Sequence, residues 1–347
     1  MNSWERVLKA VNFDGPDKVP IFHAFLPGAF MRYGERINEI LTRYPQDYAP
    51  VNQYATMLED PIYRKGITFK DEWGCVWKNP LGGIAGQVKG FPLENLDNLK
   101  TYVFPDPLEE NRPFGSTTFG ETENYLKREG HEKFVSVDYI CYFERLRWLR
   151  GFENFLMDIL KNRRELPILM DGVLNYNLKR IKRWGETEVD EIFFGDDWGT
   201  QEDLMINPQL WRKLFKPQYR KMFDAVHKSG KLVHFHSDGY IIDIIPDLIE
   251  LGVDIINVQM QIMGINTLAE RFGGKICFRS DLDRQQIMPF GTPRQVKNHV
   301  KTIIRVFASF DGGLIGCGEI SQAEPFLNVV AMFEAFEKYG KYPLGKG

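Results

Sequence analysis

The sequence predicts an α/β protein folded as a (β/α)8 barrel. The C-terminal two thirds of the chain alternates short apolar segments with amphipathic ones, the order expected of a parallel sheet with crossover helices. Four or five such units fit into about 150 residues, which favours a closed barrel over an open sheet. No Gly-x-Gly-x-x-Gly follows an early strand, which argues against a Rossmann domain. The length of 347 residues suits one such domain, 1–347.

The expected strands are short apolar runs that end in polar residues. Near-continuous apolar character is typical of strands buried on both faces. The residues involved are 19–22, 134–139, 191–197, 231–236, 254–258, 275–279 and 313–317.

The expected helices have apolar residues at helical spacing and clear start and stop signals. A helix over 208–228 bends near Pro217 and stops at Gly230, and a helix over 240–251 ends at Gly252. Thr292 and Pro293 are good N-cap and N1 residues for a helix reaching Phe307. Shorter helices are expected over 268–272 and 325–338.

Residues 24–130 are irregular and rich in Pro, Gly and aromatic residues. We interpret them as an N-terminal extension that packs over the barrel mouth. A hairpin is expected around 72–77 and 86–91.

Composition narrows the class of protein and its partners. The formal net charge is −3, the pI is about 6.1, and hydrophobic residues make up 43% of the chain. These values predict neither a nucleic-acid partner nor a membrane partner. Glu5, Arg6 and Lys9 interrupt the first residues, unlike a signal peptide, and no apolar run is long enough to span a membrane. Four widely spaced cysteines indicate thiols or metal ligands in a reducing cytoplasm and not a disulfide framework.

The chemistry is expected at the stretch His234-Phe-His-Ser-Asp238-Gly239, where a buried strand ends. Side chains two apart on a strand point the same way, and barrel active sites lie at the C-terminal strand ends. His236 and Asp238, joined by Cys317 from a later strand, could bind zinc. The alternative is a hydrogen-bonded His–Asp pair. His234 lies deeper and is expected in the core, and Cys277 is a reserve ligand.

Other strand ends supply further polar groups. Asp197, Glu319 and His23 are candidate proton carriers or substrate contacts. Asp196 and Asp283 are expected to cap the helices that follow.

The chain resembles the uroporphyrinogen decarboxylase superfamily, including its corrinoid-dependent methyltransferase branch. The resemblance runs over nearly the whole chain, from Glu5-Arg-Val-Leu-Lys-Ala10 and Pro16-Asp-Lys-Val-Pro20 onward. The most specific stretches are Asp196-Asp-Trp-Gly-Thr-Gln201 and Pro208-Gln-Leu-Trp211 with Phe215-Lys-Pro217. The pattern continues with His236-Ser-Asp-Gly239, Gly252-Val-Asp254, Gly291-Thr-Pro293 and Pro325-x-x-Asn328. The resemblance implies a (β/α)8 barrel.

Particular residues bear on which branch of the superfamily, decarboxylase or methyltransferase, the chain resembles more. The decarboxylases have an arginine-rich segment near the N-terminus, but the equivalent residues here are Phe22-His-Ala-Phe-Leu-Pro-Gly-Ala-Phe30. The methyltransferases bind zinc through His-x-Cys and a distant Cys. Here His236 and Cys317 match, and Asp238 replaces the middle Cys.

A carboxylate donates less to zinc than a thiolate and leaves it a stronger Lewis acid, which suits an oxygen leaving group. We therefore expect a zinc enzyme that takes a methyl group from a small O-methyl donor, such as an aryl methyl ether. The acceptor would be the Co(I) corrinoid of a separate protein. The alternatives are a corrinoid-to-thiol methyltransferase of the coenzyme M type, and a metal-free decarboxylase or binding barrel.

Overall fold

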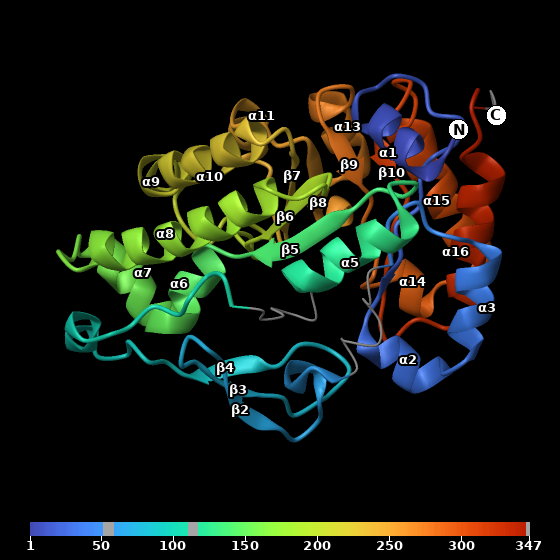
Figure 1. The fold of residues 1–347 in the computed structure, drawn as a ribbon. Helices are drawn as coiled ribbons and strands as arrows, with labels where there is room; N and C mark the ends of the chain where they lie inside the picture. Colours follow the sequence, from blue (N-terminus) through green and yellow to red (C-terminus); the bar gives the residue numbers. More distant parts are fainter. Residues whose placement is uncertain (51–58, 110–116, 345–347) are drawn as a thin grey trace.

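A six-stranded parallel sheet forms most of the barrel (Figure 1). The computed structural model describes residues 1–50, 59–109 and 117–344. Along the sheet the strands are ordered β10-β9-β8-β7-β6-β5. Their bounds are β5 (Ser136–Ile140), β6 (Glu191–Gly195), β7 (Leu232–Ser237), β8 (Ile255–Val258), β9 (Cys277–Arg279) and β10 (Leu314–Ile315).

Single bridges continue the ring from β10 back toward β5. Ile21 forms a parallel bridge with Gly316, and Tyr48 forms one with Phe134, just before β5. The Asp47 amide donates to the Ile21 carbonyl at 2.9 Å and links these two segments. Beside them, β1 (Ala24–Phe25) pairs in parallel with β11 (Glu319–Ile320). The predicted α/β barrel class is confirmed. Residues 47–49, expected in the extension, instead take a strand position in the ring.

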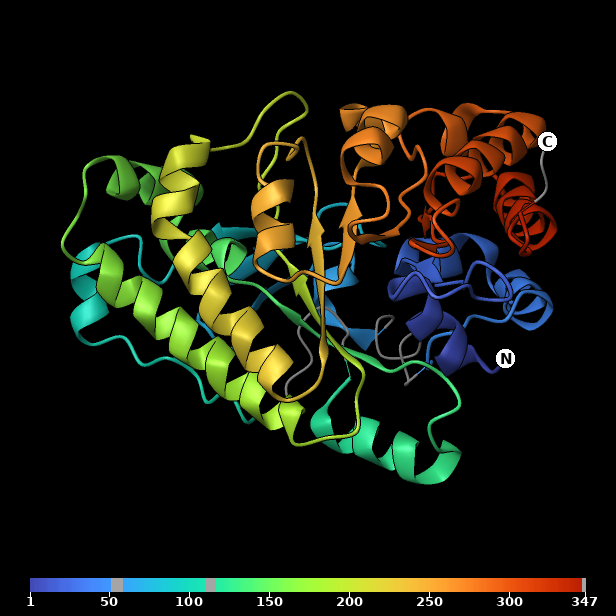
Figure 2. The ribbon, with the colours of Figure 1, turned by 90° about the horizontal axis from the view of Figure 1, so that it is seen from above.

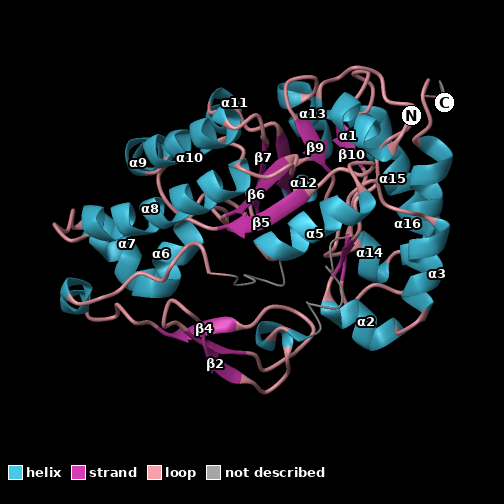
Figure 3. Ribbon diagram, viewed as in Figure 1, coloured by secondary structure: helices cyan, strands magenta, loops and turns pink. Residues whose placement is uncertain are grey.

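Helices pack around the outside of the sheet (Figures 2 and 3). α8 (Leu166–Gly185) packs on α10 (Lys216–Lys228), and α15 (Pro293–Phe307) packs on α16 (Phe326–Tyr339). As predicted, Thr292 caps α15, through a capping box with Gln295. The predicted bend separates α9 (Pro208–Leu214) from α10, at Phe215. The predicted helix over 240–251 is shorter, because only Ile245–Glu250 (α11) is helical.

The remaining helices are α1 (Ser3–Val11), α2 (Pro27–Tyr33), α3 (Arg36–Arg43), α5 (Phe119–Glu129), α6 (Phe143–Arg150), α7 (Phe152–Leu160), α12 (Met260–Met263), α13 (Ile265–Phe272), α14 (Ile287–Phe290), and the 3-10 turns η1 (Pro61–Tyr63) and η2 (Leu96–Lys100). None of the helices in the described part of the chain is long and apolar enough to cross a bilayer.

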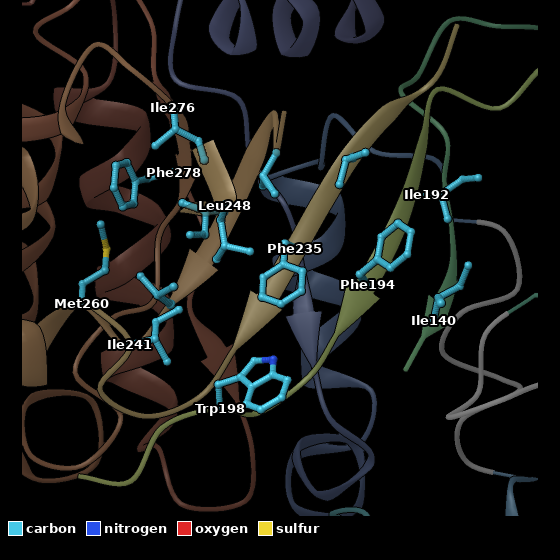
Figure 4. Packing of buried hydrophobic residues seen from close by; sticks show 14 of the residues in the cluster. Ile140, Ile192, Phe194, Trp198, Phe235, Ile241, Leu248, Met260, Ile276 and Phe278 are labelled. Carbon is cyan, nitrogen blue, oxygen red and sulfur yellow. The ribbon is translucent and has the colours of Figure 1, made fainter. Parts of the chain in front are cut away.

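The main core lies between the strands and the outer helices (Figure 4). On β7, Phe235 is fully buried and packs edge-on against Tyr219 and close to Phe223, both on α10. Because strand side chains alternate, the flanking His234 and His236 must face the interior of the barrel. Helix packing thus orients the two histidines.

The N-terminal extension contains a three-stranded antiparallel sheet, seen below the barrel in Figure 1. Its strands are β2 (Thr68–Lys70), β3 (Val76–Lys78) and β4 (Gln87–Gly90). The predicted hairpin is confirmed as β3 and β4, with β2 added at its edge.

Candidate functional site

A cavity of about 710 Å³ lies between the C-terminal strand ends and the β3–β4 hairpin. The polar part of its lining includes Asp197, His236, Asp238, Asn257, Arg279, Arg284 and Glu319. Its aromatic part includes Tyr63, Trp77, Phe91, Tyr139, Trp148, Phe152 and Phe193. The cavity therefore offers charged groups from the barrel and flat apolar surfaces, several of them from the extension.

Asp197, His236 and Asp238 form a group that could hold a metal ion. One ligand atom from each lies within 4.8 Å of the others. His236 Nε2 lies 3.6 Å from Asp238 Oδ1 and 3.7 Å from Asp197 Oδ1. Two donors that each lie about 2.0–2.2 Å from one zinc ion are at most about 4 Å apart, so these separations fit a shared ion. The backbone holds the group together, because the Asp238 amide donates to Asp197 Oδ1 at 2.9 Å.

The orientation of His236 leaves one ring nitrogen open to this group. Its Nδ1 lies 2.7 Å from Asn257 Oδ1. The amide group of Asn257 is oriented by Arg279, because Asn257 Nδ2 donates to the Arg279 carbonyl at 3.0 Å. The oxygen of Asn257 therefore faces His236, and His236 must donate from Nδ1. Nε2 then carries a lone pair directed to the two carboxylates, as a metal ligand requires.

Arg284, which the sequence reasoning missed, ties the carboxylates of the site together. It donates to Asp238 Oδ1 and, at 3.0 Å, to Glu319 Oε1. Its Nε lies 3.8 Å from Asp281 Oδ2. Burial raises the pKa of the Asp281 carboxyl to about 8. Arg284 therefore offsets part of the negative charge that a metal ion would otherwise meet.

Two predicted site residues lie apart from the metal-capable group. His23 is buried beside Phe25 and Phe333, and its Nε2 lies 2.7 Å from the Tyr44 carbonyl. Burial lowers its pKa to about 4. Cys317 is not among the residues that line the cavity. Its backbone amide donates to Ser280 Oγ at 2.8 Å, and burial raises the pKa of its thiol to about 12.

Three residues expected to be structural, His234, Asp196 and Asp283, are held by hydrogen bonds to other parts of the chain, and the reserve ligand Cys277 lies in the core. His234 is fully buried with Nδ1 2.8 Å from Glu191 Oε1, and burial lowers its pKa to about 4. Asp196 accepts from the backbone amides of Tyr142 and Glu144 at the start of α6, so it caps a helix that precedes it in the chain and not, as predicted, the helix that follows. Asp283 accepts from the amides of Gln285 and Gln286, just before α14. Cys277 is fully buried within β9.

Glu144 is a second residue of the lining that strand-end reasoning could not find, because it belongs to α6. Its Oε2 accepts from Arg147 Nη2 at 2.5 Å, and its Oε1 has no hydrogen-bond partner among the described residues. Burial raises the pKa of this carboxyl to about 8. Glu144 is therefore largely a neutral acid at neutral pH.

The fold and the family are both shared with known proteins. A methyltransferase from Methanosarcina mazei superimposes with a TM-score of 0.70 and 16% sequence identity, covering 98% of this chain and 99% of that one. A 3-keto-D-glucoside 4-epimerase from E. coli is more distant, with a TM-score of 0.42, 11% identity, and coverage of 73% of this chain and 96% of its own.

No curated protein matches the chain. The family model described as uroporphyrinogen decarboxylase (URO-D) matches residues 147–339, which is more than half of the sequence. The chain therefore belongs to the uroporphyrinogen decarboxylase family.

Proposed function

We propose that this chain is a metal-dependent methyltransferase that removes a methyl group from an O-methyl donor. The acceptor would be the Co(I) corrinoid of a separate protein. The observation that supports this most directly is the group of Asp197, His236 and Asp238 at one side of an aromatic-lined cavity. The fold shared with a methyltransferase from Methanosarcina mazei supports the type of reaction.

The donor set fits zinc. His236 would bind through the nitrogen that Asn257 leaves open, and Asp238 and Asp197 would each bind through a carboxylate oxygen. Cys317 stays a predicted further donor, from the segment that follows β10. Zinc bound by these groups would supply Lewis acidity that weakens the bond between the methyl group and its oxygen.

The side chains of the cavity would bind and protonate the donor. Its aromatic lining, which includes Trp77, Phe91 and Trp148, suits a flat ring and excludes water from it. When the methyl–oxygen bond breaks, the methyl group passes to cobalt and the oxygen needs a proton. Glu144 is placed in the lining to provide it, since burial keeps its carboxyl protonated at neutral pH.

The thiol-methylating alternative is less well supported. Within the described residues, the metal-capable group contains two carboxylates and no thiolate. Oxygen ligands leave the metal harder and more acidic than thiolates do, which favours polarising an oxygen over activating a thiol.

Metal analysis and a methyl-transfer assay test the proposal together. The purified chain should hold about one zinc per chain, and a His236→Ala variant should hold almost none. With a Co(I) corrinoid acceptor and a panel of methoxy compounds, the absorbance change of methyl-cobalt formation should appear with at least one donor. Absence of stoichiometric metal, or methylation of a thiol with no ether consumed, would contradict the proposal.

A further inference from the structure

Arg279 stands apart from the other buried arginines of the chain. In the described ranges, five arginines are buried: Arg6, Arg145, Arg150, Arg180 and Arg279. Four of them have a carboxylate partner at 2.6 to 3.0 Å, respectively Asp17 with Asp47, Asp71, Asp158 and Asp138. Arg279 has no carboxylate oxygen within 4.0 Å among the residues that the structure describes. Buried charges are normally paired, so this exception calls for a partner from outside the chain.

The surroundings of Arg279 hold its guanidinium at the cavity. The guanidinium carbon lies 4.6 Å from the ring centre of Phe22 and 4.7 Å from that of Phe193. Nη2 donates to Asn257 Oδ1 at 2.9 Å, while Nε has no partner among the described residues. Arg279 lines the cavity and is only 7% exposed. The rings of Phe22 and Phe193 and the amide of Asn257 thus hold the guanidinium of Arg279 in position without a ligand.

Glu191 and Asp281, two carboxylates of the barrel interior, have partners other than Arg279, and the second oxygen of Glu191, Oε2, has no hydrogen-bond partner among the described residues. Glu191 accepts from His234 on the neighbouring strand at 2.8 Å. Asp281 lies 3.8 Å from Arg284, which also binds Asp238 and Glu319. The other cavity arginine, Arg147, is bound to Glu144. Among these three cavity arginines, Arg279 is the one with no carboxylate oxygen within 4.0 Å in the described part of the chain.

We propose that Arg279 binds a carboxylate of the molecule that occupies the cavity. Combined with the aromatic lining, this makes the ligand an aromatic carboxylate. With the proposed function, on which this last step rests, the methyl donor is a methoxylated aromatic acid. A guanidinium binds a carboxylate through two parallel hydrogen bonds, and aromatic faces hold both the guanidinium and the ring of the ligand.

Binding measurements test this without metal, corrinoid or turnover. The probes are 2-, 3- and 4-methoxybenzoate and the three methoxyphenylacetates, each paired with its neutral amide, and titrations are followed by calorimetry. At least one acid should bind roughly 10- to 100-fold more tightly than its amide, because charge-assisted hydrogen bonds to Arg279 add affinity of this size. Arg279→Gln should abolish this preference, and Arg279→Lys should restore part of it. Arg147→Gln, which alters a paired arginine of the same cavity, should keep most of it.

Stability gives a second readout that separates a ligand-binding arginine from a structural one. Arg180→Gln leaves Asp138 buried without its cation and should lower the melting temperature strongly. Arg279→Gln strands no carboxylate and should lower it much less. The proposal is overturned if no acid binds better than its amide, if Arg279→Gln keeps the preference, or if it destabilises the chain as much as Arg180→Gln. A chain that binds the acids selectively but transfers no methyl group would contradict the proposed function alone.

Discussion

His234 and His236 lie two residues apart on β7 and face the same side of the strand, yet their surroundings differ in kind. His234 is fully buried and bound to the Glu191 carboxylate of β6. His236 is bound on one nitrogen to the neutral amide of Asn257 on β8, and its other nitrogen faces Asp197 and Asp238 at the cavity. Depth along the strand therefore separates a structural histidine from a candidate ligand. Each histidine has one ring nitrogen without a hydrogen-bond partner among the described residues, but that of His234 is enclosed in the barrel, while that of His236 faces two carboxylates at the cavity.

Exchanging each histidine for alanine tests this contrast most strongly. His236→Ala should weaken zinc binding by more than about 100-fold with little loss of stability, because it removes a ligand at the cavity surface whose side chain is 17% exposed. His234→Ala should do the reverse: it should lower the free energy of unfolding by on the order of 3 kcal/mol, because Glu191 stays buried without its partner. Metal titration and urea denaturation of both variants measure the two effects. The contrast fails if both variants lose metal equally.

The same contrast shows how far sequence reasoning reaches. Strand ends predicted a ring of polar groups at the mouth, and Asp197, His236 and Asp238 lie there together, while Cys317, predicted to join His236 and Asp238, is not among the residues that line the cavity. His234 lies in the core, as predicted. His23 was expected to contact substrate because it ends a strand. His23 is not among the residues that line the cavity, because its ring is buried against Phe25 and Phe333, with Nε2 2.7 Å from the Tyr44 carbonyl.

The missed residues share a different cause. The role of each missed residue depends on partners that lie far from it in the sequence, or on the lack of such partners. These residues are Arg279, Arg284 and Glu144. Arg284 contacts Asp238 and Glu319, which are 46 and 35 residues away. No local pattern encodes that a buried arginine lacks a carboxylate, since this depends on every element packed around it. The fold could therefore be predicted from periodicity, and the charge balance of the site could not.

The predicted metal ligands and the metal-capable group of the structure share His236 and Asp238 and differ in the third residue, which is Cys317 in the prediction and Asp197 in the structure. If Asp197 completes the site with His236 and Asp238, Asp197→Asn should weaken zinc binding by about 100-fold and Cys317→Ser by less than about 3-fold. If Cys317 moves in to bind the metal, the two variants should exchange these effects. Cobalt-substituted protein offers an independent spectroscopic measure, because only a thiolate ligand adds a charge-transfer band in the near ultraviolet.

Asn257 tests whether the outer histidine depends on its neutral partner. Asn257→Ala should weaken zinc binding by roughly 10-fold, since the ring of His236 is no longer held with its proton on Nδ1. The effect should be smaller than that of losing any ligand. Asn257→Asp is the matched control, because it keeps an acceptor for Nδ1 and should retain most of the affinity. Equal losses in both variants would show that Asn257 does not act through His236.

His234, the inner histidine, should make the stability of the fold depend on pH. Burial lowers the folded-state pKa of His234 to about 4 from 6.5, so between these values the unfolded chain binds more protons than the folded one. Stability should therefore fall as the pH drops from 6.5 toward 4, with a contribution from His234 of at most about 1.4 kcal/mol per pH unit. His234→Gln, which cannot be protonated, should reduce this slope in urea denaturation series. His23, whose folded pKa is also about 4, contributes a similar slope that the variant leaves in place. An unchanged slope in His234→Gln would mean that His234 is already protonated in the folded chain, as the cation of a buried pair with Glu191.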